Sequence, residues 1–134
     1  MGIDLGTKRI GVATSDATGT LASPYTVIER RGDRAADHRA VAAVVAEVEA
    51  ERVVVGLPLS LSGHVGASAQ AASAEAGELA AVLPVPVETF DERLTTVSAD
   101  RALQAAGTNA RDRRRRVDSA AAAVMLQAWL DGRR

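Results

Sequence analysis

The stretch GIDLGTKRIGVATSD, residues 2–16, decides the fold. Its apolar residues predict two strands around a turn, and the first of them contains a carboxylate, Asp4. An unpaired charge in a buried strand is costly, so we expect Asp4 to be paired, to end the strand or to bind a metal ion. Only Met1, Gly2 and Ile3 precede Asp4, so the first strand should be short and the natural start is expected to lie upstream.

The rest of the chain alternates between strand patterns and helix patterns. Further strands are predicted over 21–30, 52–58 and about 85–90, and helices over 33–51, 67–82, 95–106 and from 118 onward. Strands that alternate with helices after an initial meander predict an α/β fold, with a mixed sheet and helices on both of its faces. The chain has 134 residues, which fits one domain over 1–134.

Composition excludes several classes of protein. The chain has no cysteine, which excludes disulfides, thiolate zinc sites and cysteine nucleophiles. No segment approaches the ~20 apolar residues of a membrane span, and the N-terminal residues do not resemble a signal peptide, so a cytoplasmic protein with no membrane partner is expected. The net charge is only −1, so there is no overall basic field of the kind that indicates nucleic-acid binding.

Three acidic residues stand out by their context. Asp4 lies in the first strand, Glu92 follows the last strand, and Asp118 precedes a run of small residues. Strand ends and helix starts of a mixed sheet gather at one edge, so these carboxylates can converge there. Converging carboxylates need a cation, and oxygen ligands suit Mg²⁺ or Mn²⁺, which would support hydrolysis of a phosphodiester bond.

Most of the acids and histidines also have a structural interpretation. Asp118 taken alone is more typical of a helix N-cap, and Glu92 taken alone is typical of a solvated strand end. Asp16 is a candidate fourth carboxylate, for which a role in a turn is at least as strongly favoured. His38 and His64 lack the spacing of metal ligands and are expected at the surface.

Basic residues are concentrated in one run, RDRRRR, residues 111–116, immediately before Asp118. Such a run is usually solvated or disordered, but its position equally favours phosphate binding beside the site, by residues such as Arg113 and Arg114. The chain holds one Trp, one Tyr and one Phe, too few to stack on several bases. Any contact with nucleic acid should therefore be made mainly to phosphates and to overall shape.

Four blocks, in this order over essentially the whole chain, carry a family resemblance: GIDLGTKRIGVATSD, VVVGLPLSLSG, DERLTT and VDSAAAAVMLQAWL. Together they resemble the YqgF family, also called RuvX, whose members are described as Holliday junction resolvases and pre-16S ribosomal RNA nucleases. The resemblance implies a ribonuclease H-like fold, with a five-stranded mixed sheet and helices on both faces.

The same resemblance implies roles for particular residues. Asp4, Glu92 and Asp118 match the family's proposed active-site acids, which would be both the catalytic residues and the ligands of Mg²⁺ or Mn²⁺. Further residues are expected to line or border the site: Lys8, Arg9, Arg93, Thr95, Thr96, and Gly56-Leu57-Pro58 with the loop to Gly66. The glycines on either side of Asp4, Gly2 and Gly6, are expected to let backbone or substrate phosphate come close.

The favoured function is metal-dependent cleavage that processes the 5′ end of pre-16S ribosomal RNA, as the family description implies. One alternative is resolution of a four-way DNA junction, which needs two symmetric cuts and would favour a homodimer. Another is a non-catalytic module that binds structured RNA through its arginines. DLGT also resembles the phosphate loop of actin-like ATPases and sugar kinases, but those proteins clamp ATP between two domains and this chain is long enough for one.

Overall fold

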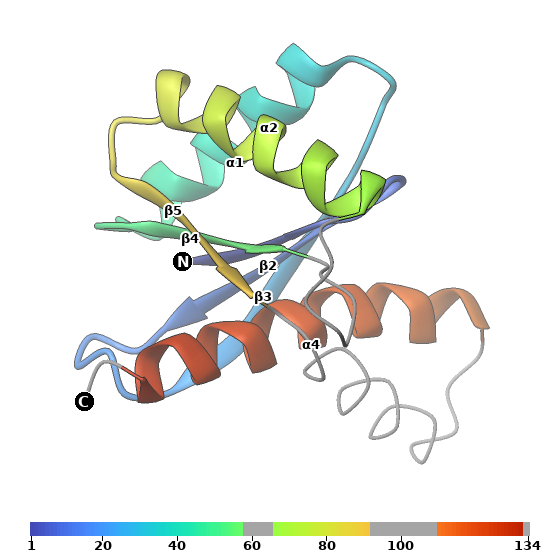
Figure 1. The fold of residues 1–134 in the computed structure, drawn as a ribbon. Coiled ribbons are helices and arrows are strands. Elements are labelled where there is room, and N and C mark those ends of the chain that lie inside the picture. Colours follow the sequence, from blue (N-terminus) through green and yellow to red (C-terminus); the bar gives the residue numbers. More distant parts are fainter. Residues whose placement is uncertain (58–65, 92–109, 133–134) are drawn as a thin grey trace.

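A five-stranded sheet forms the centre of the computed structural model of the chain (Figure 1). The structure describes residues 1–57, 66–91 and 110–132, and for residues 67–68 and 110–118 it describes the backbone alone. In chain order the elements are β1 (Gly2–Leu5), β2 (Arg9–Ser15), β3 (Ala22–Glu29), α1 (Arg34–Glu47), β4 (Val53–Leu57), α2 (Ala67–Val82), β5 (Val87–Asp91) and α4 (Ala110–Asp131). The helix expected over 95–106 lies outside the described residues.

β1 lies in the middle of the sheet, whose strand order is β3-β2-β1-β4-β5. It pairs antiparallel with β2 and parallel with β4, and β5 pairs parallel with the far side of β4. The predicted meander and the mixed sheet are therefore confirmed. Because β1, β4 and β5 run in the same direction, their carboxyl ends lie at the same edge of the sheet.

Helices cover both faces of the sheet, with α1 and α2 on one face and α4 on the other (Figure 1). Ile3 of β1 is fully buried on the α1 and α2 side, where it clusters with Val41 and Leu79. On the other face, Met125 and Leu126 of α4 are fully buried and cluster with strand residues. Each such side chain stabilises the fold by about 1.5–3 kcal/mol, so both helical layers are held mainly by apolar burial.

The two helices of the first layer agree closely with the sequence. Asp33 caps α1 as predicted, since its carboxylate accepts hydrogen bonds from the backbone N–H groups of Ala35 and Ala36 at 3.0 and 3.3 Å. α1 ends at Glu47, four residues earlier than expected, because Glu49 adopts a left-handed φ of 54° that ends the helix. α2 has the predicted bounds.

The start of the last helix was predicted wrongly. α4 begins at Ala110, so Asp118 lies in the interior of a helix of 22 residues and is not its N-cap. The arginine run belongs to this helix, and its backbone is neither extended nor irregular. The physical reason is that arginine is a good helix former, so the run continues the helix on the N-terminal side of Asp118. Among the described helices, none combines the length and the apolar character needed to cross a membrane.

Candidate active site

Asp4 lies on the central strand with a glycine on each neighbouring strand. Its Cα pairs with Gly11 of β2 on one side and with Gly56 of β4 on the other. The strand pairing continues to Leu5, so the expectation that Asp4 ends the strand is wrong. Neither glycine has a side chain, so neither of these two positions covers the partly buried Asp4.

The face of the sheet to which Asp4 points is the one covered by α4. Neighbours along a strand point to opposite faces, and Ile3 is buried on the side of α1 and α2. Gly2, which shares a face with Asp4, meets α4 directly: a Cβ added at Gly2 would lie 2.9 Å from Leu126 Cβ and 3.3 Å from Met125 Cε. Gly2 is therefore needed for the close approach of this helix.

α4 runs against the direction of β1, which fixes where Asp118 is placed along the helix. Leu126 lies against Gly2, and beyond it Gln127 hydrogen-bonds the backbone of Thr20 and Ala22 in the turn between β2 and β3. This turn lies past the amino-terminal end of β1, because Ala22 pairs with Ser15, two residues after the partner of Gly2 (Figure 1). Residues before Leu126 therefore lie toward the carboxyl end of β1. The backbone of Asp118 is eight residues, or about 12 Å of helix, before Leu126 on that side.

β5 leads toward the same edge. Its last residue, Asp91, pairs with Leu57, which follows Gly56 in β4. Glu92 comes next in the chain but lies outside the described residues, as do Arg93, Thr95 and Thr96, His64, and most of the loop from Pro58 to Gly66. Within the part of the chain that the structure describes, no three acidic or histidine side chains gather as a metal site would require.

The turn after Asp4 places two of the predicted substrate-binding residues. Gly6 closes this turn: its N–H donates to the carbonyl oxygen of Arg9 at 2.9 Å, and a Cβ at Gly6 would lie 2.6 Å from the same oxygen. Lys8 is exposed, and Arg9 is half-buried at the start of β2. At Gly2 and Gly6 the space that a Cβ would occupy is already taken, by side chains of α4 and by the Arg9 carbonyl oxygen respectively. These glycines therefore allow close packing within the protein, and a substrate phosphate has no room at these two points.

Arg113 and Arg114 belong to the first turns of α4. Their backbone is helical, and their side chains lie outside the described part of the structure.

Asp16 is a turn residue. Its carboxylate accepts backbone hydrogen bonds from Thr20 and Leu21, which lower its pKa below the ordinary value. It follows β2 at the sheet edge opposite the end of β1, so it is not a fourth ligand beside Asp4.

His38 is buried, which overturns the expectation of a surface position. Only 6% of it is exposed, and its Nε2 lies 2.8 Å from a carboxylate oxygen of Glu75, a buried acid on α2 that the sequence interpretation missed. A usable signal was present. Glu75 stands three residues after Ala72 and four before Leu79, at the spacing of the buried face of α2.

A pocket lies at the opposite edge of the sheet, and the described residues that line it do not include Asp4. It is lined by Met1, Asp16, Arg52 and Trp129, among others. Trp129 donates from its indole N–H to Glu88, and the Arg52 guanidinium stacks over the Trp129 ring at 5.8 Å. These contacts lock the C-terminal end of α4 against the sheet, which is a structural role.

The five-stranded mixed sheet with helices on both faces has the ribonuclease H-like fold. The structure is similar to that of Thermus thermophilus RuvC, with a TM-score of 0.54 and 18% identity over 98% of this chain and 93% of that chain. The same protein in complex with a Holliday junction substrate gives a TM-score of 0.57 and 16% identity over 98% and 92%. Both likenesses establish the ribonuclease H-like fold.

The particular family follows from the sequence comparisons. The chain belongs to the RuvX family: a family model described as "RuvX: Holliday junction resolvase" matches residues 1–132. A relative from Mycobacterium ulcerans is 53% identical over 136 residues, covering 100% of this chain and 79% of that protein. One from Anaeromyxobacter sp. is 50% identical over 133 residues, covering 99% and 96%. Both relatives are named "Putative pre-16S rRNA nuclease".

Proposed function

We propose that this chain is a metal-dependent nuclease that hydrolyses phosphodiester bonds in processing the 5′ end of pre-16S ribosomal RNA. The observation that carries the proposal is the position of Asp4, a carboxylate on the central strand between two glycines and on the face that α4 covers. The names of the relatives support the choice of reaction and of substrate.

The residues fit a divalent cation. Asp4 is a partly buried carboxylate near the carboxyl end of β1, Glu92 follows β5 in the sequence, and Asp118 belongs to α4, so the three acids would offer oxygen ligands from three parts of the chain. Such a donor set suits Mg²⁺ or Mn²⁺. When bound there, the metal would supply an activated water and stabilise the leaving oxygen. The rigid strand supplies the fixed position of Asp4.

Basic and hydroxyl side chains would hold the substrate in this proposal. Lys8 and Arg9 follow Asp4 by a single tight turn, and Lys8 is exposed. They would contact the phosphate at the cleaved bond, together with Arg93 and Thr95. Arg113 and Arg114 of α4 would contact neighbouring phosphates, because α4 crosses the same face of the sheet.

Two other activities compete with this proposal. Resolution of a four-way DNA junction is suggested by the description of the family as a Holliday junction resolvase and would require two active sites, which implies a homodimer. A non-catalytic RNA-binding module would use the arginines of α4 and leave the acids without a role. It predicts binding that is independent of metal and steeply dependent on salt.

The experiment that separates these activities offers the protein two labelled substrates. One is an RNA that carries the 5′ precursor extension of 16S ribosomal RNA, and the other is a four-way DNA junction, each with Mg²⁺, with Mn²⁺ or with EDTA. We expect metal-dependent cleavage of the RNA that is lost in Glu92→Gln. Cleavage of the junction alone would favour the resolvase activity, and metal-independent binding without cleavage of either substrate would favour the RNA-binding module.

A further inference from the structure

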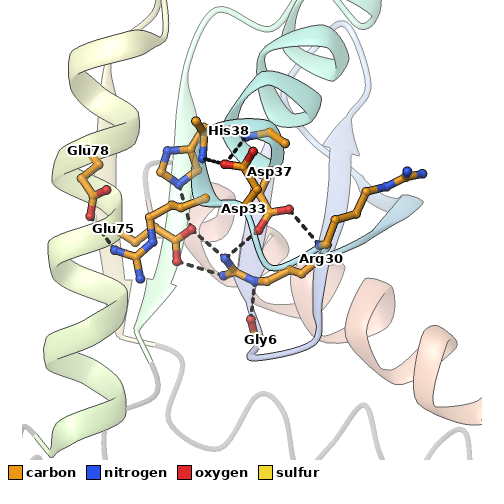
Figure 2. A network of polar contacts seen from close by, with 11 residues as sticks. Gly6, Arg30, Asp33, Asp37, His38, Glu75 and Glu78 are labelled. Carbon is orange, nitrogen blue, oxygen red and sulfur yellow. Dashed lines mark hydrogen bonds and ion pairs between the residues drawn. The ribbon is translucent and has the colours of Figure 1, made fainter.

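Arg30, the residue after β3, holds the turn that follows Asp4 at two points. Its backbone N–H donates to the carbonyl oxygen of Lys8 at 2.9 Å, and its side-chain Nε donates to the carbonyl oxygen of Gly6 at 2.8 Å. Figure 2 shows the guanidinium reaching from the end of β3 to Gly6. One residue therefore fixes the backbone on both sides of Thr7.

The guanidinium is itself held by acids of the two helices on that face. Nη1 and Nη2 of Arg30 each donate to a different carboxylate oxygen of Glu75, at 2.8 and 2.9 Å (Figure 2). Asp37 of α1 lies 3.5 Å from Nη1. A bidentate pair fixes the plane of the guanidinium as well as its position, so the direction of the Nε–H toward Gly6 is fixed too.

Burying these charged side chains costs desolvation free energy, which the ion pairs only partly offset. Glu75 is 4% exposed and Asp37 is 4% exposed, and His38 shares the Glu75 carboxylate. Apolar residues of similar size in place of a buried ion pair often leave a protein equally or more stable. Stability alone does not explain why charged groups are gathered here, and through Arg30 the network contacts the turn beside Asp4.

We propose that Arg30, oriented by Glu75, is a positioning residue that fixes the turn from Gly6 to Lys8 and so presents Lys8 and Arg9 to the substrate phosphate beside Asp4. The turn is already tight, because Gly6 lies against the carbonyl oxygen of Arg9. The two hydrogen bonds from Arg30 further restrict the backbone of the exposed part of this turn, Thr7 and Lys8. The role in cleavage rests on the proposed nuclease function, whereas the grip on the turn does not.

Two variants and one control test the proposal. The double variant Arg30→Met with Glu75→Gln removes both charges of the bidentate pair together and leaves an amide to hydrogen-bond His38, while Asp37 still accepts the backbone N–H of Arg31. Arg30→Lys keeps a positive charge for Glu75 but lacks the forked guanidinium that reaches Gly6 at the same time. The control is Glu78→Gln on α2, which breaks the ion pair with Arg34 at 2.8 Å, where both side chains are about half exposed.

The first measurement is amide hydrogen exchange by NMR, which needs no catalytic activity. We expect the Gly6 amide to exchange about tenfold faster or more in both Arg30 variants. The amide of Val54, which donates to the Met1 carbonyl oxygen at 2.9 Å, is the internal reference and should not change. Unchanged exchange at Gly6 in folded variants would overturn the proposal, whether or not the wild type cleaves any substrate.

The second measurement is the steady-state kinetics of RNA cleavage. We expect kcat to fall by about 10- to 100-fold in both variants, with a smaller change in KM, because a misplaced turn costs reaction geometry more than binding. Glu78→Gln should match the wild type. Faster exchange at Gly6 with an unchanged kcat would show a merely structural role and overturn the positioning claim. If the wild type cleaves nothing, the proposed function fails, and exchange at Gly6 alone decides whether Arg30 holds the turn.

Discussion

Asp4 lies directly beside Gly56 in the parallel pairing of β1 with β4. Cβ atoms at such paired positions stand about 5 Å apart on the same face of a sheet. A side chain at position 56 would therefore stand next to the carboxylate of Asp4. The glycines on both flanking strands are buried and carry no side chain, so only the backbone of those strands lies directly beside the carboxylate of Asp4.

The substitution Gly56→Ala should reduce RNA cleavage by about tenfold and destabilise the fold by about 1–3 kcal/mol, because alanine adds one methyl group at a buried position beside Asp4. Cleavage rates at saturating metal and urea unfolding check the two parts. The control is Gly77→Ala on α2, where an added Cβ meets nothing within 4 Å. It should stabilise the helix by about 0.5–1 kcal/mol and leave cleavage unchanged. Equal cleavage by both variants would contradict the need for a glycine at position 56.

The substitution Gly2→Ala should destabilise the fold by about 1–3 kcal/mol, because the new Cβ would lie 2.9 Å from Leu126 Cβ and α4 would have to move. Cleavage should fall as well, since α4 carries Asp118. Urea unfolding measures the first effect, and cleavage at a temperature where the variant is fully folded measures the second. A stable variant with normal cleavage would show that α4 does not pack against Gly2 as described.

Stability should depend on acid through Glu75. Burial would raise the pKa of Glu75, but the hydrogen bonds and charges of Arg30 and His38 outweigh it, so the pKa lies below its ordinary value of 4.5. A carboxylate with a lowered pKa in the folded state stabilises the fold above its unfolded pKa, and this contribution is lost as the pH falls through the folded pKa. The free energy of unfolding should therefore decline as the pH is lowered below about 4.5.

The variant Glu75→Gln tests this source of acid sensitivity. It should be less stable than the wild type at pH 7 by about 3 kcal/mol, since it leaves the Arg30 charge without its main partner. The difference between the two proteins should shrink as the pH falls below about 4.5. Urea unfolding at several pH values gives both results. A difference that stays constant down to pH 3 would exclude Glu75 as the group responsible.

Metal binding should be visible as stabilisation. Without metal, Asp4→Asn should be as stable as the wild type or more stable, because it removes one of several negative charges that we propose to converge. With Mg²⁺ or Mn²⁺ at about 100 times its dissociation constant, the wild type should gain about 2.7 kcal/mol and the variant much less. Thermal unfolding with metal or with EDTA measures both. An equal gain in the two proteins would place the metal elsewhere.

The sequence predicts most of the fold because its local signals agree with the tertiary structure. Turn residues end the strands where expected, Asp33 caps α1, and the bounds of α2 are as predicted. The start of α4 was misjudged because an acidic residue before small residues looks like a cap, whereas the arginines before it are equally good helix formers. Local patterns do not distinguish these two cases.

The candidate site is only partly predictable for a different reason. Asp4 is evident from the sequence because a charge interrupts a strand of apolar residues. The contact of Arg30 with Glu75 joins residues 45 positions apart, and that of Glu75 with His38 joins residues 37 positions apart. No local pattern specifies such pairs. An acidic residue on the apolar face of α2 indicates that a partner exists, but only the packing of α1 against α2 identifies it.

The most direct test of the role of Asp4 compares Asp4→Asn with Asp16→Asn in cleavage of the precursor RNA with Mn²⁺. Both changes remove one charge from the same stretch, and an asparagine at position 16 can still accept the hydrogen bonds from Thr20 and Leu21. We expect Asp4→Asn to fold normally and to lose cleavage by on the order of 100-fold or more, while Asp16→Asn cleaves like the wild type. Cleavage by folded Asp4→Asn at the wild-type rate would contradict a catalytic, metal-binding Asp4.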